Sequence, residues 1–376
     1  MEFDFTEEQL EIRTSVRTAL EKECPIELVR GIVESGKRAT QPWETAVELG
    51  WPALMVPEDN DGLGLDFASM ALVLEEHGRA VAPGPFLTTT TQFLPTMIEC
   101  GTDAQKEKFL PTLAEGELRG TLAISNEAGG LGAVDDSMTA KRDGDKWKLN
   151  GQRHWVMEAN HSDEIIVSAR DADGGLQLFV VPSSDAKLVK IESFDESRSL
   201  CTLTLEAYEI SDDRRLSGAS DTQTGLDRAL DVAVTALSLE MVGTCQRILD
   251  VSLEYAKERK QFGVAIGTFQ AIQHKFSDLF VLLEKARSTA YYATMTLAED
   301  DGQRRIAASM AKAAAGDCQK RMGKEGIQIH GGIGYTWEHN MHLFVRRAKS
   351  GAQLLGTTSE HKVKVADLIT ADTTRS

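Results

Sequence analysis

The sequence is poor in basic residues relative to acidic ones: 41 Lys and Arg face 58 Asp and Glu, which gives a formal net charge of −17. Because a charge of this sign repels phosphate backbones and anionic lipid head groups, we expect no sequence-independent binding to nucleic acid or to a membrane surface. The five cysteines are scattered and lack the CxxC or Cys/His spacing of a metal site. We therefore expect no bound metal and interpret the cysteines as reduced, packed thiols.

Long hydrophobic runs are absent as well. The most apolar stretch, residues 229–242, is interrupted by Asp231 and Glu240 and is too short to span a bilayer, so we expect no membrane insertion. The first residues are acidic where a signal peptide would be basic and then apolar, which favours a cytoplasmic location. What is present is an ordinary globular composition, 41% apolar and 26% charged over 376 residues, enough for roughly two or three domains.

The hydrophobic pattern divides the chain into three parts. Apolar residues up to about residue 110 show the spacing of short helices. Short alternating segments separated by Gly and Asp turns follow, and from about residue 225 long helical runs return. We therefore predict an α+β chain with an N-terminal helical domain (1–112), a middle antiparallel β domain of sandwich or barrel-like form (113–218) and a C-terminal four-helix bundle (219–376).

One motif joins a charged helix end to aromatic residues. Residues 255–263 read Tyr-Ala-Lys-Glu-Arg-Lys-Gln-Phe-Gly. In a purely structural interpretation, the basic residues complement the negative end of a helix dipole and Gly263 ends the helix. In a functional interpretation, Arg259 offers a fixed, always charged fork to a phosphate, while Phe262 and Phe269 provide apolar walls for a flat ring.

A second motif is rich in glycine. Residues 328–339 read Gln-Ile-His-Gly-Gly-Ile-Gly-Tyr-Thr-Trp-Glu-His. The glycines at 331, 332 and 334 let the backbone turn sharply and approach a ligand closely. The alternative is an ordinary turn between two helices, because the motif lacks the strand-turn-helix setting of a dinucleotide fingerprint and the Lys-Ser/Thr of a P-loop.

Together, and in this order, the two motifs resemble those of the acyl-CoA dehydrogenase family, flavoenzymes that desaturate acyl thioesters between Cα and Cβ. The resemblance implies FAD as cofactor, an acyl-CoA substrate from fatty acid or sterol side-chain metabolism, and electron-transferring flavoprotein as acceptor. It also implies a tetramer built on the C-terminal helices, either of one chain or of two related chains. It extends over the whole chain, through Gly50-Trp51, Gly62-Leu63-Gly64, Gly116-Glu117 and Asn150-Gly151-Gln152.

The resemblance also assigns residues to FAD. In the β domain it places Ser125 and Trp155 beside the flavin ring. Two positions depart from the family pattern: Met157 replaces a threonine whose hydroxyl bonds the N5 edge of the flavin, and Leu131 replaces a serine that meets the CoA part of the substrate. The residues implied at the pyrophosphate and adenosine of a neighbouring subunit's FAD are Arg259, Gln261, Phe262, Gln328, Gly331 and Gly332.

The catalytic base is the largest departure. The chemistry requires a carboxylate that takes the α-proton, and the resemblance places that Glu at the position of Leu355 or at that of Ala233. Glu240, about two turns beyond Ala233 in an apolar helix, is the remaining candidate base if burial raises its pKa. The alternative for Glu240 is a buried carboxylate bonded to an Arg or a helix end. Glu360 is the less favoured base, because residues 357–359 are typical of an exposed turn.

Three functions follow. The first is FAD-dependent α,β-dehydrogenation of an acyl-CoA thioester, with hydride passing from Cβ to flavin N5. The absence of both usual glutamates favours a second, in which the chain is a non-catalytic, FAD-holding partner subunit of a heteromeric acyl-CoA dehydrogenase. The departure at Leu131 leaves a third, a flavin oxidase or monooxygenase of the same family.

Overall fold

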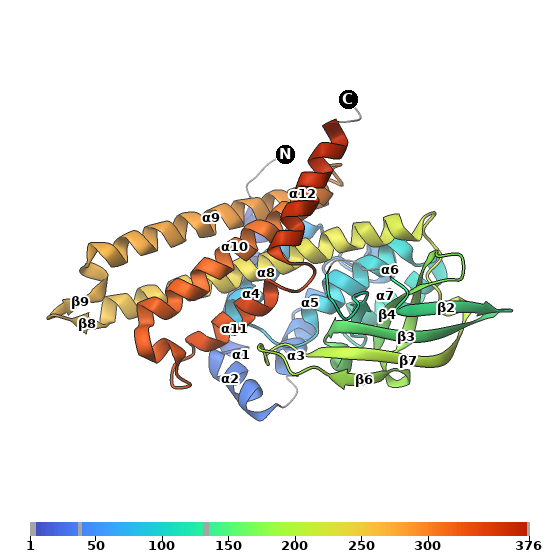
Figure 1. Ribbon diagram of the computed structural model, residues 1–376, viewed down its shortest axis with the longest axis horizontal. Coiled ribbons are helices and arrows are strands. Elements are labelled where there is room, and N and C mark those ends of the chain that lie inside the picture. Colours follow the sequence, from blue (N-terminus) through green and yellow to red (C-terminus); the bar gives the residue numbers. More distant parts are fainter. Residues whose placement is uncertain (1–4, 37–39, 131–134, 374–376) are drawn as a thin grey trace.

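The computed structural model describes residues 5–36, 40–130 and 135–373. Along the chain, helices occupy both ends and the strands of a sheet come between them; in space the sheet lies at one end of the molecule (Figure 1). The predicted fold class is confirmed in this arrangement, with helical N- and C-terminal parts and a middle β part.

The N-terminal part consists of helices whose starts are set by capping side chains. Thr6 begins α1 (Glu7–Glu23) and Thr102 begins α7 (Asp103–Ala114), each in a capping box with a glutamine at the third helical position. The segment η3 (Thr89–Phe93) is a π-helix, and all of its residues are buried. The other elements are α2 (Ile26–Ser35), α3 (Gln41–Glu48), η1 (Trp51–Ala53), η2 (Glu58–Asn60), α4 (Phe67–Ala80), α5 (Phe86–Thr88) and α6 (Leu94–Cys100).

The middle part is one seven-stranded sheet in the order β1-β4-β2-β3-β7-β6, with β5 paired to β4. Most pairings are antiparallel, but β4 pairs in parallel with β1 and, at one residue pair, with β2, which the sequence pattern does not indicate. The hairpin of β2 and β3 lies between them in sequence and supplies the long connection that a parallel pair needs. The strands are β1 (Gly120–Ala123), β2 (Met138–Asp143), β3 (Lys146–Met157), β4 (Glu164–Arg170), β5 (Leu176–Pro182), β6 (Lys187–Lys190) and β7 (Leu200–Ser211).

The C-terminal part is built on three long helices. These are α8 (Thr222–Glu258), α9 (Gln270–Ala298) and α10 (Arg304–His330). A small hairpin, β8 (Lys260–Gln261) and β9 (Val264–Ala265), joins α8 to α9 and lies at the end of the molecule away from the sheet (Figure 1). The remaining elements are η7 (Ile266–Thr268), η8 (Gly331–Tyr335), α11 (Met341–Gly351) and α12 (Thr358–Thr373).

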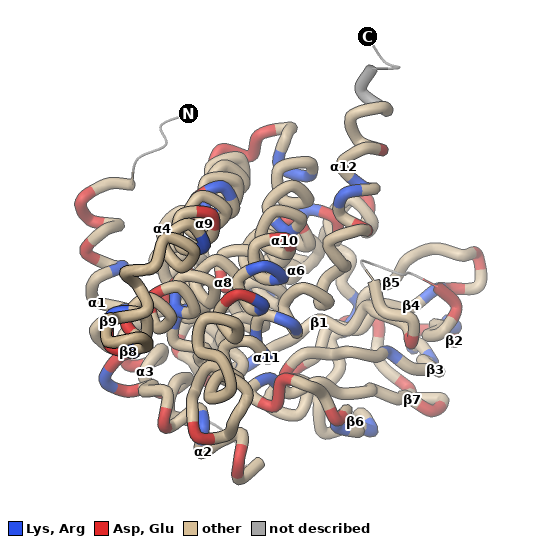
Figure 2. The backbone as a smooth tube through the Cα atoms, turned by 60° about the vertical axis from the view of Figure 1, so that its left-hand side comes forward, with Lys and Arg blue, Asp and Glu red and all other residues tan. Residues whose placement is uncertain are grey.

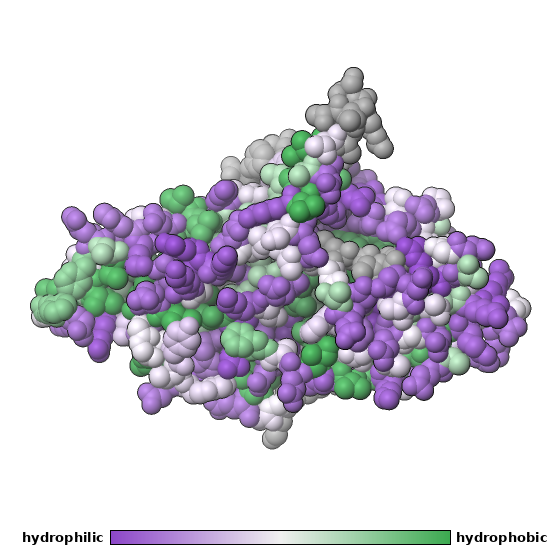
Figure 3. All heavy atoms as spheres, viewed as in Figure 1, coloured by the Kyte–Doolittle hydropathy of each residue, from purple (hydrophilic) through white to green (hydrophobic). Residues whose placement is uncertain are grey.

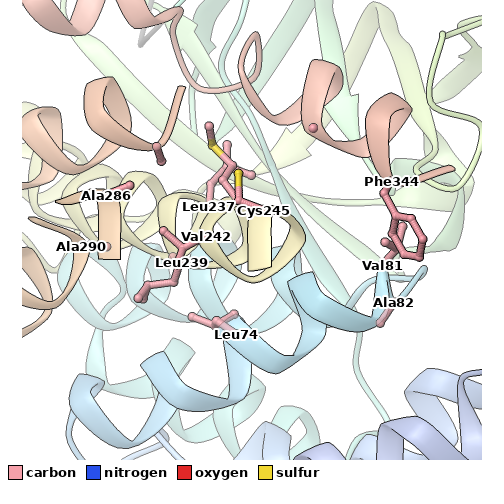
Figure 4. Packing of buried hydrophobic residues seen from close by; sticks show 14 of the residues in the cluster. Leu74, Val81, Ala82, Leu237, Leu239, Val242, Cys245, Ala286, Ala290 and Phe344 are labelled. Carbon is pink, nitrogen blue, oxygen red and sulfur yellow. The ribbon is translucent and has the colours of Figure 1, made fainter. Parts of the chain in front are cut away.

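Helices α4 and α8 approach so closely that their contact requires glycine. A Cβ on Gly78 would lie 1.9 Å from the carbonyl oxygen of Glu240, and one on Gly243 would lie 1.8 Å from that of Glu75. Leu74 and other apolar side chains from both helices are buried around this contact (Figure 4). The N-terminal helices and the C-terminal bundle therefore share one core.

By length and composition alone, the whole of α8 is long and apolar enough to span a membrane, whereas the shorter stretch 229–242 is not. However, 83% of the most apolar 18 residues of α8 are buried inside the protein. Because α4, α9 and α10 all pack against it, we interpret α8 as the central core helix.

Charged residues of both signs are interspersed along the helices and strands (Figure 2). All five cysteines are buried and free, as predicted. Within the described ranges, no group of three or more His, Cys, Asp or Glu side chains is placed to hold a metal ion.

Candidate active site

A cavity of about 50 Å³ lies where η3, the sheet and the turn after α11 meet. The Trp155 ring nitrogen donates to the carbonyl oxygen of Glu127 at 3.1 Å, and the Ser125 hydroxyl donates to the carbonyl oxygen of Gly130 at 3.3 Å. The structure therefore brings Ser125 and Trp155 together at one cavity. We call it the ring cavity; it is lined by Gln92, Leu122, Ile124, Ser125, Gly129, Gly130, Trp155, Met157, Gln353, Leu354 and Leu355.

Trp155 is held in an unusual backbone conformation. Its φ is 57°, in the left-handed region, and it lies where the register of β3 against β7 shifts between Arg153 and Val156. A bulky residue rarely adopts this conformation, and such bulges re-aim a side chain beside a functional site. Trp155 keeps 39% of its surface exposed at the wall of the ring cavity.

Leu355 also lines the ring cavity, at a turn whose backbone is left-handed at both Leu355 and Gly356. This is one of the positions where the family resemblance implies the catalytic Glu; Ala233, at the other, is buried in α8. Every described residue that lines the cavity is uncharged. No described lining residue therefore supplies a carboxylate, and the nearest one is that of Glu360, whose oxygen lies 3.2 Å from where a Cβ on Gly130 would stand.

Glu240 lies in a buried group of charges outside the ring cavity. Its carboxylate accepts hydrogen bonds from Arg198 and from Arg347, each at 2.6 Å, and none of the three side chains is more than 5% exposed. Burial alone would raise the pKa of Glu240, but the two guanidiniums outweigh it and hold that pKa below its usual value. The expected rise in pKa is therefore wrong, and the alternative, a buried Glu bonded to arginine, describes the structure.

The same charges connect the β domain to the helices. Arg347 of α11 also contacts Asp195 at 3.1 Å and donates to the Ser197 hydroxyl at 2.9 Å. Asp195 and Arg198 come from the loop between β6 and β7, and Glu240 comes from α8. We call Asp195, Arg198, Glu240 and Arg347 the charge cluster. Because its two cations face two anions, it is suited to fixing domains together rather than to moving protons.

Glu360 is placed at the start of α12 rather than near an exposed turn. The Thr357 N–H donates to its carboxylate at 2.6 Å, and the Glu360 N–H donates to the Thr357 hydroxyl at 3.2 Å. The prediction of a turn at residues 357–359 is therefore wrong, because these residues form the capped first turn of a helix. The N–H of Thr357 lowers the pKa of Glu360, which makes this carboxylate a weaker base.

The residues implied at a neighbour's FAD lie together at the opposite end of the molecule from the sheet (Figure 1). The Tyr255 ring stacks on the His330 ring at 4.4 Å between centroids and joins the end of α8, just before the hairpin, to the end of α10, just before η8. Phe262 is 93% exposed, and apolar residues gather over the hairpin (Figure 3). We call this surface the distal half-site; it comprises Arg259, Gln261, Phe262, Gln328, Gly331 and Gly332, all exposed.

A polar cavity of about 370 Å³ adjoins the ring cavity and shares Gln353 with it. The side chain of Gln319 is only 3% exposed there, and both of its amide atoms lack a hydrogen-bond partner. The N-terminus of α12 adds a positive dipole end. The cations that line this cavity are Lys320, Lys349 and Lys362, and Lys362 pairs at 2.9 Å with the one lining carboxylate among the described residues, Asp317.

These features fit an FAD molecule: an aromatic wall for the ring, and cations with a helix N-terminus for the pyrophosphate. The sequence analysis missed the polar cavity, because its lysines come from α10, α11 and α12 and meet only in the fold. The local sequence signal for this cavity was the pair Gly356-Thr357, which directly precedes α12 and marks the start of that helix. Leu131, the other predicted departure, lies outside the described residues.

Comparison with known proteins gives matches along the whole chain. Three family models match: the N-terminal domain of acyl-CoA dehydrogenase over residues 6–117, its middle domain over 121–210 and its C-terminal domain over 226–369. The probable acyl-CoA dehydrogenase YngJ of Bacillus subtilis is 29% identical over 97% of this chain and 99% of its own. Acyl-CoA dehydrogenase IpdE2 of Mycobacterium tuberculosis is 30% identical over 94% of this chain and 95% of its own. The caffeyl-CoA reductase-Etf complex subunit CarC of Acetobacterium woodii is 26% identical over 97% and 99%.

Solved structures agree with these matches. The butyryl-CoA dehydrogenase of Megasphaera elsdenii superposes with a TM-score of 0.91 at 24% identity, over 98% of this chain and 100% of the other. The steroid ACAD Tcur3481-Tcur3483 has a TM-score of 0.88 at 30% identity, over 98% and 99%. An acyl-CoA dehydrogenase of Bacillus anthracis complexed with FAD has a TM-score of 0.90 at 24% identity, over 99% and 68%.

Proposed function

Because this chain belongs to the acyl-CoA dehydrogenase family, oxidoreductases that act on acyl-CoA with FAD as cofactor, we propose that it is an FAD-holding subunit of an acyl-CoA dehydrogenase in which a related chain supplies the catalytic carboxylate. One observation carries the proposal: the ring cavity is lined by uncharged side chains, with Leu355 at one of the implied base positions. The nearest described carboxylate, that of Glu360, lies behind Gly130 and accepts the N–H of Thr357, which lowers its pKa and makes it a weak base for an α-proton.

The distal half-site supports the same proposal. Arg259 is an exposed, permanently charged fork, and Gly331 and Gly332 leave open space where a side chain would otherwise stand. An apolar side chain as exposed as Phe262, at 93%, is typical of a surface that another molecule covers. A neighbour's FAD would lie here, so this chain can complete a neighbouring active site although the described lining of its own cavity contains no carboxylate.

In such an assembly the two chains contribute different groups to the reaction. FAD, when bound, supplies the acceptor for the hydride that leaves Cβ, while the α-proton passes to the carboxylate of the related chain. The residues of this chain hold the adenosine and pyrophosphate half, and the charge cluster keeps its β domain against α8 and α11. We propose a heterotetramer, supported by the paired name of the steroid ACAD, and electron-transferring flavoprotein as acceptor, supported by the Etf complex of CarC.

Reconstitution tests this function. The chain is purified alone and together with a family member of the same genome that carries Glu at the position equivalent to Leu355. Each preparation receives FAD and a panel of acyl-CoA thioesters, and reduction of a ferrocenium dye is followed. We expect turnover by the pair and none by this chain alone, with both chains in one tetramer by native mass spectrometry. Turnover by the chain alone would overturn the proposal.

A further inference from the structure

A separate cavity, of about 280 Å³, lies where α1, α2, α4, α8 and α11 meet. None of its described lining residues belongs to the ring cavity, the polar cavity, the charge cluster or the distal half-site. The function proposed above therefore gives this cavity no role. We call it the junction cavity; it is lined by Arg17, Leu20, Glu21, Cys24, Pro25, Ile26, Glu27, Glu76, Arg79, Ala80, Arg247 and Phe344.

Arg247 differs from the other arginines of the junction cavity, because no described carboxylate pairs with it. Arg17 contacts Glu76 at 2.6 Å, and Arg79 forms an ion pair with Asp250. Arg247, by contrast, neither donates a hydrogen bond nor forms an ion pair with any residue that the structure describes. Its side chain lines the cavity, so a ligand bound there can reach all of its free donors.

The charge of Arg247 is costly where it stands. The residue is half-buried in α8, and burial together with the neighbouring Arg79 lowers its pKa. A guanidinium nevertheless stays protonated at physiological pH. Because a partly desolvated charge without a partner costs free energy, an anion bound beside Arg247 would stabilise the protein.

The ring of Phe344 fixes the position of this guanidinium. Phe344 is only 2% exposed, and the guanidinium carbon of Arg247 lies 6.0 Å from the ring centroid. Figure 4 shows the ring on α11 next to Val81, at the end of α4. A guanidinium held over an aromatic ring keeps its planar edge free for two parallel hydrogen bonds to a carboxylate or a phosphate.

The carboxylates of the junction cavity decide between these two anions. Glu76 is buried, and the charges of Arg13 and Arg17 offset its own. Glu21 and Glu27 also line the cavity, and both are exposed to solvent. Because like charges repel, these carboxylates disfavour a phosphate with two negative charges more strongly than a carboxylate with one.

The rest of the wall is apolar. It is formed by Leu20, Ile26, Ala80 and Phe344. The volume of about 280 Å³ is close to the lower end of the ~300–1,000 Å³ that is typical of small-molecule sites. An acid with a short alkyl or aromatic body matches this size and this surface.

From these contacts we propose that the junction cavity binds a small carboxylic acid with an apolar body. Its carboxylate pairs with the guanidinium of Arg247, and its body lies against Leu20, Ile26 and Phe344. The site is independent of the proposed function, since it shares no described residue with the ring cavity. Because the cavity joins the N-terminal helices to α8 and α11, the bound acid stabilises the contact between the two helical parts of the chain.

Calorimetric titration of the FAD-reconstituted chain tests this inference with octanoate and with octanamide, which has the same shape but no charge. We expect the wild type to bind octanoate at least about tenfold more tightly, as hydrogen bonds between charged groups provide. Arg247→Gln should abolish this preference. Arg228→Gln is the matched control on the same helix, because Arg228 lies outside the cavity and pairs with Glu99 at 2.9 Å, and it should keep the preference.

A second variant tests the site without changing a buried residue. Glu27 is exposed, so Glu27→Gln should fold like the wild type. It removes one repulsive charge from the cavity and should bind octanoate about two- to threefold more tightly, with no change for octanamide. The melting temperature of Arg247→Gln should equal or exceed that of the wild type, because an unpaired charge is lost, and octanoate should raise the melting temperature of the wild type alone.

The remaining outcomes contradict the inference. Equal affinity of the wild type for octanoate and octanamide, or for neither, overturns the site, as does an unchanged octanoate affinity in Glu27→Gln. A preference for octanoate that persists in Arg247→Gln places the acid elsewhere in the chain and also overturns it. If inorganic phosphate binds more tightly than octanoate and is lost in Arg247→Gln, the ligand is a phosphate and not a carboxylic acid. None of these results bears on reconstitution with a related chain, so either proposal can fail alone.

Discussion

Replacing Glu240 by glutamine separates a structural carboxylate from a catalytic base. The side chain keeps its shape but loses the charge that faces Arg198 and Arg347, which are at most 4% exposed. Arg347 keeps Asp195 at 3.1 Å, whereas Glu240 is the only carboxylate bonded to Arg198 among the described residues. Removing one partner of a buried ion pair costs about 3–5 kcal/mol, because a charge is left buried without its counter-ion.

This free energy converts to a shift in melting temperature. An unfolding entropy of about 2.1 cal/mol/K per residue, over 376 residues, gives about 0.8 kcal/mol/K, so the variant should melt about 4–6 °C below the wild type. Differential scanning calorimetry at pH 7 measures the shift. Glu254→Gln is the matched control on the same helix: its carboxylate pairs with Lys257 at the surface, and exposed pairs contribute little.

The pH dependence provides a second check. Because the folded-state pKa of Glu240 lies below the usual value of 4.5, its stabilising effect is complete above that pH and is lost as pH falls through the lower, folded-state pKa. The gap between the wild type and Glu240→Gln should therefore narrow in acid. A variant as stable as the wild type at pH 7 would refute this reasoning, and loss of turnover by the reconstituted pair without loss of stability would make Glu240 the base.

Three further changes have defined outcomes. Leu355→Glu should give the chain a dye-linked oxidation of acyl-CoA at least about a hundredfold above the wild type, the usual contribution of a positioned base; the same gain from Gln353→Glu would show that position is unimportant. Arg259→Gln should lower the flavin retained per chain after gel filtration, whereas Lys257→Gln should not; equal retention in both variants would remove Arg259 from the cofactor site. Burial lowers the pKa of Lys312 to about 7. Between pH 7 and 10 the unfolded chain keeps this proton and the folded chain does not, so the free energy of unfolding of the wild type should rise with pH. Urea titrations of Lys312→Met should show no such rise.

Much of the fold could be predicted because its signals are local. The capping boxes at Thr6 and Thr102 lie within single turns, and the period of apolar residues separates helices from strands. The parallel pairing of β1 with β4 could not be predicted, since it depends on which strands become neighbours and not on the pattern within either strand.

The candidate site, too, has features that the local sequence indicates and features that only the fold determines. Apolar neighbours in sequence indicated that Glu240 is buried, but its partners are 42 and 107 residues away, where nothing local marks them. Gln92 follows a run of threonines that is typical of a polar segment, and its burial depends on the contact between η3 and β1. The roles of Arg259, Phe262 and Gly331 at FAD stay predictions, because they concern a molecule and a neighbour beyond a single chain.

The glycine contact between α4 and α8 determines how the chain can be divided. At Gly78 and Gly243 the backbones of the two helices are in direct contact. Because no side chain fits between them, neither helix can carry polar side chains there that would let it stay in water alone. Residues 5–114 and 222–373 are therefore one discontinuous folding unit, and the sheet is an insert within it. We therefore expect that a fragment ending after α7, which exposes the apolar side of α4, will not fold by itself. Removal of residues 120–211 would in turn expose the buried cluster that α6, α7 and α8 share with the sheet.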